Sequence, residues 1–295
     1  MRELLIDVIG NKFGEGVKRE YQYRMAYQHL DSYVKYKNTD NTILMKNTKV
    51  KLNQTIWICW LQGMDNAPII VRKCYESIKR NVPDAFDIKV ITEKTIDDYV
   101  SFPSFIYEKV KKGIISKTHF SDIIRTELLY QYGGCWIDAT VFCSRKIPDY
   151  MLSGELFFFK WSIMDISVLP GSSWWIYAKQ NNKIVREVRN VLYAYWKNES
   201  KLINYYLYHI ILAKIINSDA TNRILYNDII YCNNSTPQIL YSLLAEQFNE
   251  ERWEILDEQT PVHKLSYKRN FIRGDIESFF VALMKGKLDT GEYKV

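Results

Sequence analysis

Residues 120–141, FSDIIRTELLYQYGGCWIDATV, join a helical pattern, a double glycine and a strand pattern within one short stretch. Ser121 is a residue type that begins helices, and we expect it to be the N-cap. The pair Gly133-Gly134 predicts the helix end, because glycine readily adopts the left-handed backbone found just past a helix. The apolar residues 135–137 then predict a short buried strand. A helix followed at once by a buried strand is typical of α/β folds.

The sequence before this stretch predicts a strand, a helix and a second strand. The strands are expected over residues 55–60 and 87–92, and the helix over residues 67–80, with Pro68 near its start. Two strands joined by a helix pair in parallel, so we predict a mostly parallel sheet flanked by helices. Further helices are expected over residues 97–100, 103–110, 184–196, 202–216 and 238–247, and strands over residues 157–161 and 166–169.

The N-terminal 50 residues differ from the rest by their many charges and tyrosines and their weak helical periodicity. We interpret residues 1–50 as a helical extension and residues 51–295 as one main domain. The extension is expected either to pack on the main domain or to rest on a membrane surface. The 22 tyrosines, 13 phenylalanines and 8 tryptophans suit sugar or base binding, and codon bias explains them equally well.

Charge and cysteine content argue against several classes of protein. The net charge of +6 is modest and dispersed, which argues against a nucleic-acid-binding module. The five cysteines lack C-x-x-C spacing, so neither a zinc site nor a disulfide framework is indicated, and we expect a reducing compartment. No signal peptide or membrane span is apparent, which predicts a cytoplasmic protein, soluble or peripheral to the membrane. Glycine-rich phosphate loops are missing, which argues against ATPases, kinases and dinucleotide enzymes.

Arg125 is the most unusual residue of the predicted helix, because helical spacing places it inside the apolar stripe. A core-facing arginine needs a partner, and Asp122 lies three residues earlier, within reach. The pair is either an ordinary helix ion pair or part of a site. Asp138 follows the predicted strand, where ligands bind in open α/β sheets, although it is also explained as a turn aspartate.

These residues carry a resemblance to a known family. The stretch SDIIRTELLYQYGGCWIDATV resembles the SD-x-x-R, L-L, YGG, aromatic-x-D signature of sugar-transferring glycosyltransferases, in particular the capsular polysaccharide synthesis family. The resemblance extends over about residues 52–268. It implies a GT-A type fold, with a nucleotide-binding half over about residues 51–150 and an acceptor-binding, closing half over about residues 151–295.

The resemblance also implies roles for individual residues. Asp138, Asp122 and Arg125 are the expected catalytic residues and contact the donor's ribose and sugar. The remaining residues expected to bind the donor are Trp57, Trp60, Gln62, His263, Lys264 and Lys268. Strand alternation places the two tryptophans on opposite faces, so at most one lines the pocket. Core packing for these tryptophans and a solvated loop for the late histidine and lysines remain alternatives.

Three further expectations concern the acceptor and a metal. Trp174, Trp175 and His209 are candidates for a sugar floor or acceptor site, with core packing as the alternative. Asp138 and His263 are the candidate ligands for a manganese or magnesium ion. Thr140 stands where related enzymes have a second acid, and its neutral hydroxyl leaves the need for a divalent cation open.

We therefore expect a glycosyltransferase that moves a sugar from a nucleotide-diphosphate donor, in the first place a UDP-sugar. The expected acceptor is a lipid-linked or growing cell-surface polysaccharide, met at the inner face of the cell membrane. A hexosyl group and a retaining outcome are the favoured details. The alternative is a non-catalytic nucleotide-sugar or carbohydrate-binding protein with a degenerate acidic motif.

Overall fold

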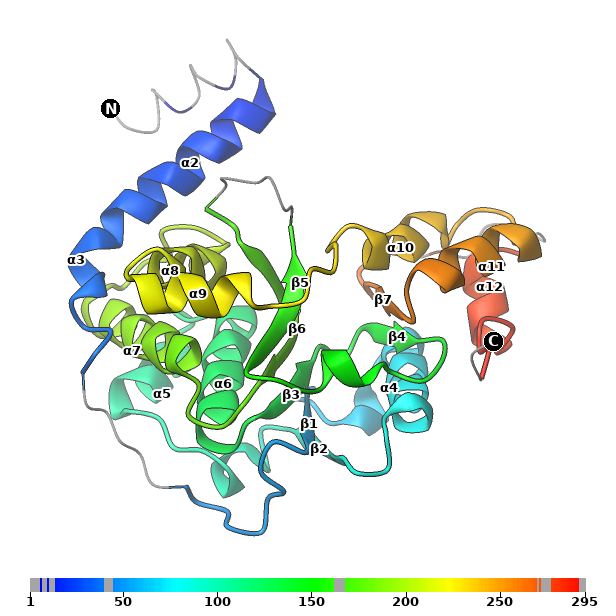
Figure 1. Cartoon of the computed structure of the whole chain (residues 1–295), viewed down its shortest axis with the longest axis horizontal. Helices are drawn as coiled ribbons and strands as arrows, with labels where there is room; N and C mark the ends of the chain where they lie inside the picture. Colours follow the sequence, from blue (N-terminus) through cyan, green and yellow to red (C-terminus); the bar gives the residue numbers. More distant parts are fainter. Residues whose placement is uncertain are drawn as a thin grey trace.

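The computed structural model describes residues 6, 10, 14–39, 45–161, 168–269, 271 and 277–291. Its centre is a five-stranded sheet with the strand order β2-β1-β3-β6-β5. Helices α5 to α8 lie on one side of this sheet, and α4 lies on the other with a separate pair of short strands (Figure 1). The expected α/β class is therefore confirmed.

The strands of the central sheet are β1 (Thr55–Cys59), β2 (Asp87–Ile91), β3 (Gly134–Ile137), β5 (Leu156–Lys160) and β6 (Gly171–Ala178), and the separate pair is β4 (Val141–Cys143) and β7 (Val262–Lys264). The helices are α2 (Glu15–His29), α3 (Asp31–Val34), α4 (Ile69–Asn81), α5 (Ser104–Lys111), α6 (Lys117–Tyr132), α7 (Lys183–Asn198), α8 (Leu207–Ile216), α9 (Ala220–Asn227), α10 (Ile239–Leu243), α11 (Glu250–Gln259) and α12 (Phe279–Met284). Short 3-10 turns span Met64–Asn66, Ile96–Asp98, Asp149–Met151 and Thr236–Gln238.

The sheet is mixed. β1 pairs in parallel with both β2 and β3, as the strand–helix–strand pattern predicts, whereas β6 pairs antiparallel with β3 and β5. Every residue of β3 is buried, and so are the first four residues of β1, because helices cover both faces of the sheet there. Apart from Thr55 at the start of β1, β1 and β3 are therefore apolar along their length.

Steric constraints explain why residues 133 and 134 are both glycine. Gly133 and Gly134 have φ angles of 68° and 90°, a left-handed region that other residues avoid. A Cβ on Gly134 would lie 2.2 Å from the carbonyl oxygen of Thr55, since the start of β3 lies directly beside the start of β1 in the sheet. The predicted helix end and the start of the buried strand are confirmed at this point.

Several predicted boundaries were wrong. Helix α6 begins four residues before Ser121, and its N-cap is Ser116, whose hydroxyl accepts a hydrogen bond from the His119 amide. The Ser121 hydroxyl instead donates to the Thr118 carbonyl within the helix. Asp122 therefore lies in the second turn of the helix.

Three more predicted segments differ in the structure. Residues 202–206 form a turn segment before α8, and 238–247 holds only the short helix α10. Of the strand expected over 166–169, residues 166 and 167 lie outside the described residues, and residues 168 and 169 are not in a strand. A four-residue segment such as 166–169 gives too few periods for its pattern to fix a type.

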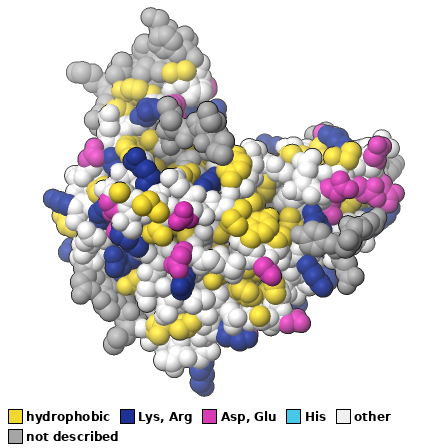
Figure 2. Space-filling view, viewed as in Figure 1, with side chains coloured by type: hydrophobic (Ala, Val, Ile, Leu, Met, Phe, Trp, Pro, Cys, Tyr) yellow, Lys and Arg dark blue, Asp and Glu magenta, His cyan; other side chains and the backbone are white. Residues whose placement is uncertain are grey.

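Two additions extend from the central α/β layers in different directions, one upward and one to the right in Figure 1. The N-terminal helix α2 packs on α8, with the ring of Tyr23 edge-on to that of Tyr206 at 5.4 Å. The C-terminal elements α10, α11 and α12 form an arm held to the rest by the β4–β7 pair. Figure 2 shows acidic side chains gathered at the outer end of this arm, where Glu250 and Glu251 begin α11. Across the described residues, every helix is too short or too polar to pass through a membrane.

Candidate active site

The ends of two parallel strands place the candidate site. The β1–β3 register pairs Trp57 with Trp136, so Cys59, the last residue of β1, lies beside Asp138, the first residue after β3. The backbone N–H of Asp138 donates to the Trp174 carbonyl at 2.9 Å, which fixes this residue at the end of β3. Burial raises the pKa of the Cys59 thiol to about 12, and nearby Arg125 opposes the shift. The thiol is therefore protonated at neutral pH.

Arg125 is the centre of the site. Its guanidinium donates to the Asp122 carboxylate at 2.6 Å and approaches the Asp138 carboxylate at 3.5 Å. The same group lies over the rings of Trp136, at 4.8 Å, and Tyr208, at 5.4 Å. The side chain is only 3% exposed, and its Nε is buried with no hydrogen-bond partner among the described residues. Arg125 is thus held rigidly between two carboxylates and two aromatic rings.

Asp138 is the more accessible carboxylate, with 28% of its side chain exposed. Trp136 Nε1 donates to one of its oxygens at 2.9 Å, and Lys264 Nζ lies 3.1 Å from the other. Burial by itself would raise the pKa of Asp138, but the positive charges of Lys264 and Arg125 outweigh it and hold the pKa below its ordinary value. Asp138 is therefore ionised at neutral pH.

Thr140 and Lys264 decide how well the site would suit a metal. Lys264 Nζ donates to the Thr140 hydroxyl as well as contacting Asp138. A divalent cation prefers free oxygen ligands, and here both oxygens of Asp138 face cations or an N–H group. In the part of the chain that the structure describes, no three His, Cys, Asp or Glu side chains gather as a metal site. This arrangement of groups does not fit a tightly held divalent cation.

His263 lies apart from Asp138, because neighbouring residues of β7 point to opposite faces. Its ring is fully buried between Phe142 and Trp253, at 6.1 and 5.2 Å. Ser144 Oγ lies 3.4 Å from His263 Nε2, and the same hydroxyl donates to Asp257. This Ser–His–Asp group is enclosed between β4, β7 and α11, where it fastens the arm. Burial lowers the pKa of His263 to about 3, so the ring is neutral.

The other residues expected to bind the donor occupy different depths. Trp57 is fully buried, and its indole N–H donates to the Gly133 carbonyl at 2.9 Å, so it is part of the core. Trp60 lies at the end of β1, half-buried, with its ring edge-on to Tyr267 at 5.2 Å. Gln62 and Lys268 are exposed on the loops that follow β1 and β7. Trp60 is therefore the tryptophan of this pair nearer to the surface of the site.

The acceptor candidates are also mostly internal. Trp174 stacks on Phe159 at 4.6 Å, and its indole N–H donates to Asn234. Trp175 is fully buried on the opposite face of β6. His209 lies closer to the Asp122–Arg125–Asp138 centre, since the charges of Asp122 and Arg125 act on its ring. Burial lowers the pKa of His209 to about 4.

Three residues near the centre were missed by the sequence analysis. They are Tyr208, whose ring lies under Arg125; His119, whose Nδ1 lies 3.5 Å from an Asp122 oxygen; and Tyr205, whose ring lies 5.8 Å from that of His119. The cluster of tyrosines before α8 was a visible signal. Its distance of about 80 residues from Asp122 in the sequence hid the contact.

Comparisons with known proteins relate the chain to one family and to several individual proteins. The model of the family described as "Capsular polysaccharide synthesis protein" matches residues 11–283. "O-glycosyltransferase PaGT" of Phomopsis amygdali is 22% identical over 162 residues, which are 50% of this chain and 40% of the relative. "O-glycosyltransferase braB" of Annulohypoxylon truncatum is 29% identical over 124 residues, 38% of this chain and 30% of the relative. The chain thus matches less than half the length of either relative.

A solved structure named "PaToxG Glycosyltransferase" aligns with a TM-score of 0.40 and 12% sequence identity. The alignment covers 82% of this chain and 94% of the other.

Proposed function

Because the chain belongs to the capsular polysaccharide synthesis family, we propose that it is a glycosyltransferase that uses a nucleotide-diphosphate sugar. The single observation that carries the proposal is the ionised Asp138 held between Arg125 and Lys264 at the ends of two parallel strands. The names of the curated relatives, both O-glycosyltransferases, support an acceptor hydroxyl. The GT-A type of the fold and the UDP-sugar donor are finer parts of the same proposal.

The chemistry requires charge stabilisation on the leaving group. The acceptor oxygen bonds to the anomeric carbon of the sugar, and the bond from that carbon to the diphosphate breaks. The diphosphate keeps the electron pair, and the hydroxyl proton leaves with it. Lys264 and Arg125 supply positive charge beside this group, and the Asp138 carboxylate binds donor hydroxyls and orients them.

The proposal assigns the donor to the open side of Asp138, with Trp60, Gln62 and Lys268 around it. We do not include Trp57, Trp175 or His263, because each is fully buried away from that side. We propose that the positively charged side chains of Lys264 and Arg125, rather than a tightly bound manganese or magnesium ion, neutralise the diphosphate. Turnover that requires added manganese after EDTA treatment would contradict this part.

The finer details remain proposals. We propose a hexosyl donor, transfer with retention, and a lipid-linked or surface polysaccharide acceptor reached at the cytoplasmic face of the membrane. Retention is checked by the anomeric coupling constant of the product in NMR, and an inverted anomer contradicts it. Cell fractionation checks the location.

The central test is Asp138→Asn, which keeps the side-chain shape and removes the negative charge. We expect transfer to fall by at least about 100-fold, because ordering of the donor in the transition state is lost. The measurement is consumption of UDP-sugars with the purified protein. Asp98→Asn, which changes an exposed aspartate on a surface turn, is the matched control and should keep normal turnover.

Two outcomes would contradict the proposal. Near-normal turnover by Asp138→Asn would remove Asp138 from the site. Donor binding by the unchanged protein without turnover, over a panel of donors and acceptors, would favour the non-catalytic sugar-binding alternative.

A further inference from the structure

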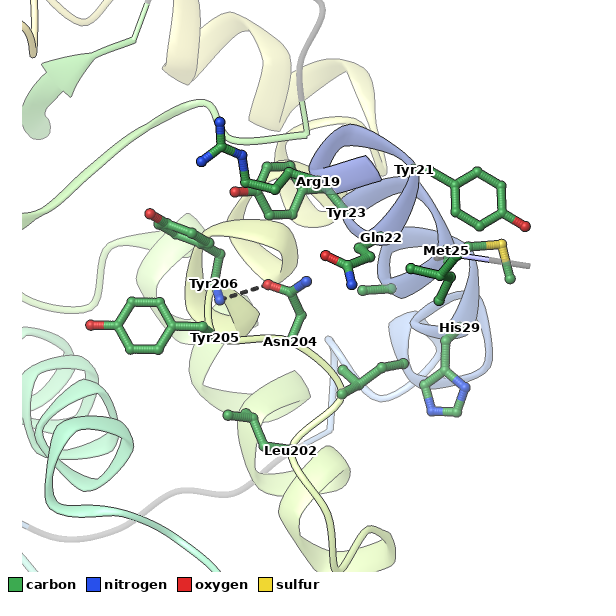
Figure 3. Close-up of a pocket in the computed structure, with 13 residues that line it drawn as sticks. Arg19, Tyr21, Gln22, Tyr23, Met25, His29, Leu202, Asn204, Tyr205 and Tyr206 are labelled. Atoms are coloured by element: carbon green, nitrogen blue, oxygen red, sulfur yellow. Dashed lines mark hydrogen bonds between the residues drawn. The ribbon is translucent and has the colours of Figure 1, made fainter. Parts of the chain in front are cut away.

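A pocket of 690 Å³ lies between helix α2 and the segment 202–206 that precedes α8 (Figure 3). This volume is within the range of sites for organic ligands. The pocket is separate from the donor side of Asp138, and none of the expected donor-binding residues lines it. Its walls come from the N-terminal helix and from the middle of the chain.

The lining is mainly apolar and aromatic. Met25 and Tyr23 come from α2, and Leu202 and Tyr206 come from the opposite wall. Leu202 is 36% exposed although it is a large aliphatic residue, and its neighbour Ile203 is 37% exposed. Binding of an apolar group in a pocket with such walls is favourable, because the group displaces water from apolar surface. Arg19 and Asn204 add a few polar groups to the lining.

Tyr205 connects this pocket to the candidate active site. It lines the pocket, but Figure 3 shows its ring directed away from α2. On that other side the ring lies 5.8 Å from the ring of His119, whose Nδ1 is 3.5 Å from Asp122. Burial raises the pKa of Tyr205, and the negative charges of Asp122 and Asp138 add to the rise. Two side chains, Tyr205 and then His119, therefore lie between the pocket and the Asp122 carboxylate.

We propose that this pocket binds the apolar part of the acceptor and directs its hydroxyl past Tyr205 and His119 to the Asp122–Arg125–Asp138 centre. The inference rests on the proposed function and deepens it. The ligand class is a hydroxyl or sugar carried on an apolar chain or ring, because the lining combines apolar side chains with the hydrogen-bonding groups of Tyr205 and Asn204. A free small glycoside and a membrane-held polyprenyl carrier share this chemistry.

The test uses the full chain and octyl β-glucoside, below its micelle concentration, as the probe. Leu202→Glu places a charge in the apolar wall, and Ile224→Glu places the same charge on the exposed face of α9, with 60% exposure, outside the pocket. We expect Leu202→Glu to weaken binding of the probe at least ten-fold in calorimetry and Ile224→Glu to leave it unchanged. Glucose without the alkyl chain should bind neither protein measurably.

Turnover gives a second readout. In Leu202→Glu the KM for the octyl glucoside acceptor should rise at least ten-fold more than the KM for the donor. A parallel assay with a polyprenyl phosphate sugar in phospholipid vesicles distinguishes the two sources of the apolar group, since only the true acceptor type should show this difference. Equal probe binding by both glutamate variants, or equal rises in the two KM values, would overturn the assignment.

These results separate the two proposals. An inactive Asp138→Asn together with unchanged probe binding in Leu202→Glu overturns only the acceptor pocket. An active Asp138→Asn overturns the proposed donor site, while a loss of probe binding in Leu202→Glu still supports the pocket.

Discussion

Thr140 lies two residues after Asp138, at the position where the resemblance to glycosyltransferases implies a second acid. The Thr140 hydroxyl accepts a hydrogen bond from Lys264, and the same ammonium group lies 3.1 Å from Asp138. The lysine charge thus lies beside both Asp138 and Thr140. Because Lys264 comes from β7, a strand more than 120 residues later, this contact can be recognised only in the folded protein.

Lys264→Ala should change the pH dependence of the reaction. Lys264 is the largest favourable influence on the Asp138 carboxylate and lowers its pKa against the effect of burial. Without it the pKa of Asp138 should rise, so the acid limb of the kcat/KM profile should move to higher pH. The measurement is the pH–rate profile of donor consumption, and the expected direction follows because the ionised form is the active one.

The control for this change is Lys285→Ala, which removes an exposed lysine paired with Glu277. Its acid limb should coincide with that of the unchanged protein. The lowered pKa of Asp138 also affects the stability of the fold. The ionised carboxylate stabilises the fold at pH values above its ordinary pKa, and this contribution is lost as the pH falls through the lowered pKa. An acid limb that stays in place in Lys264→Ala would contradict the assignment.

At the residue scale, sequence reasoning succeeded where a pattern was local. Arg125 inside an apolar stripe and Asp138 at a strand end are both local features, and both residues lie together in the structure. The burial of His263 was not predictable, because it depends on how α11 covers β7. Neither was the contact of Tyr208 with Arg125, which requires α8 to dock on α6.

At the element scale, the α6–β3 junction is the most constrained part of the fold. Both of its glycines have positive φ, and β3 leaves no room for a side chain over Thr55. The elements β1, α4 and β2 were predicted to within two residues at each end. Helix α4 is long enough to show the helical period, and both strands are rich in β-branched residues. The short elements of the C-terminal arm were not, because tertiary packing rather than local pattern fixes them.

Gly134→Ala should destabilise the protein strongly. A positive φ alone costs a non-glycine residue roughly 1–3 kcal/mol, and here the new Cβ also meets a backbone oxygen at 2.2 Å. Gly154→Ala is a matched control, because Gly154 has a φ of 85° but nothing within 4 Å of the position that a methyl group would take. Thermal unfolding should show a much larger fall in Tm for Gly134→Ala, and equal falls would contradict the close approach of β3 to β1.

At the scale of the whole molecule, the N-terminal helices are fastened by a few polar contacts. Glu199, just after α7, accepts hydrogen bonds from the Tyr33 hydroxyl at 2.6 Å and from the His29 ring at 2.9 Å. The Tyr33 hydrogen bond, followed by the other nearby donors and charges, lowers the pKa of Glu199 against a smaller effect of burial. This carboxylate therefore connects α2 and α3 to the central domain.

Glu199→Ala should loosen α2 and α3 without unfolding the rest. Hydrogen bonds to a charged group contribute about 1.5–3 kcal/mol, so local opening of this segment should become at least several-fold more frequent. Hydrogen exchange of residues 15–34 should accelerate, while that of α6 should not. Acid should have the same effect on the unchanged protein as pH falls through the lowered pKa of Glu199, because protonation removes the charge.

Glu155→Ala is the control for this experiment, since Glu155 pairs with Lys179 at an exposed site away from α2. It should leave exchange in residues 15–34 unchanged. Faster exchange throughout the chain in Glu199→Ala would mean that Glu199 supports the whole fold rather than its N-terminal part.

The pairing of β4 with β7 also has a consequence for how the chain is made. Asp122, Arg125 and Asp138 are all synthesised long before Lys264, which reaches Asp138 only when β7 pairs with β4. Domains fold from the N-terminus as the chain emerges, so a nascent chain that ends before residue 262 holds two carboxylates and one arginine without the lysine. The positive charge of Lys264 therefore joins the centre late in synthesis, when β7 pairs with β4.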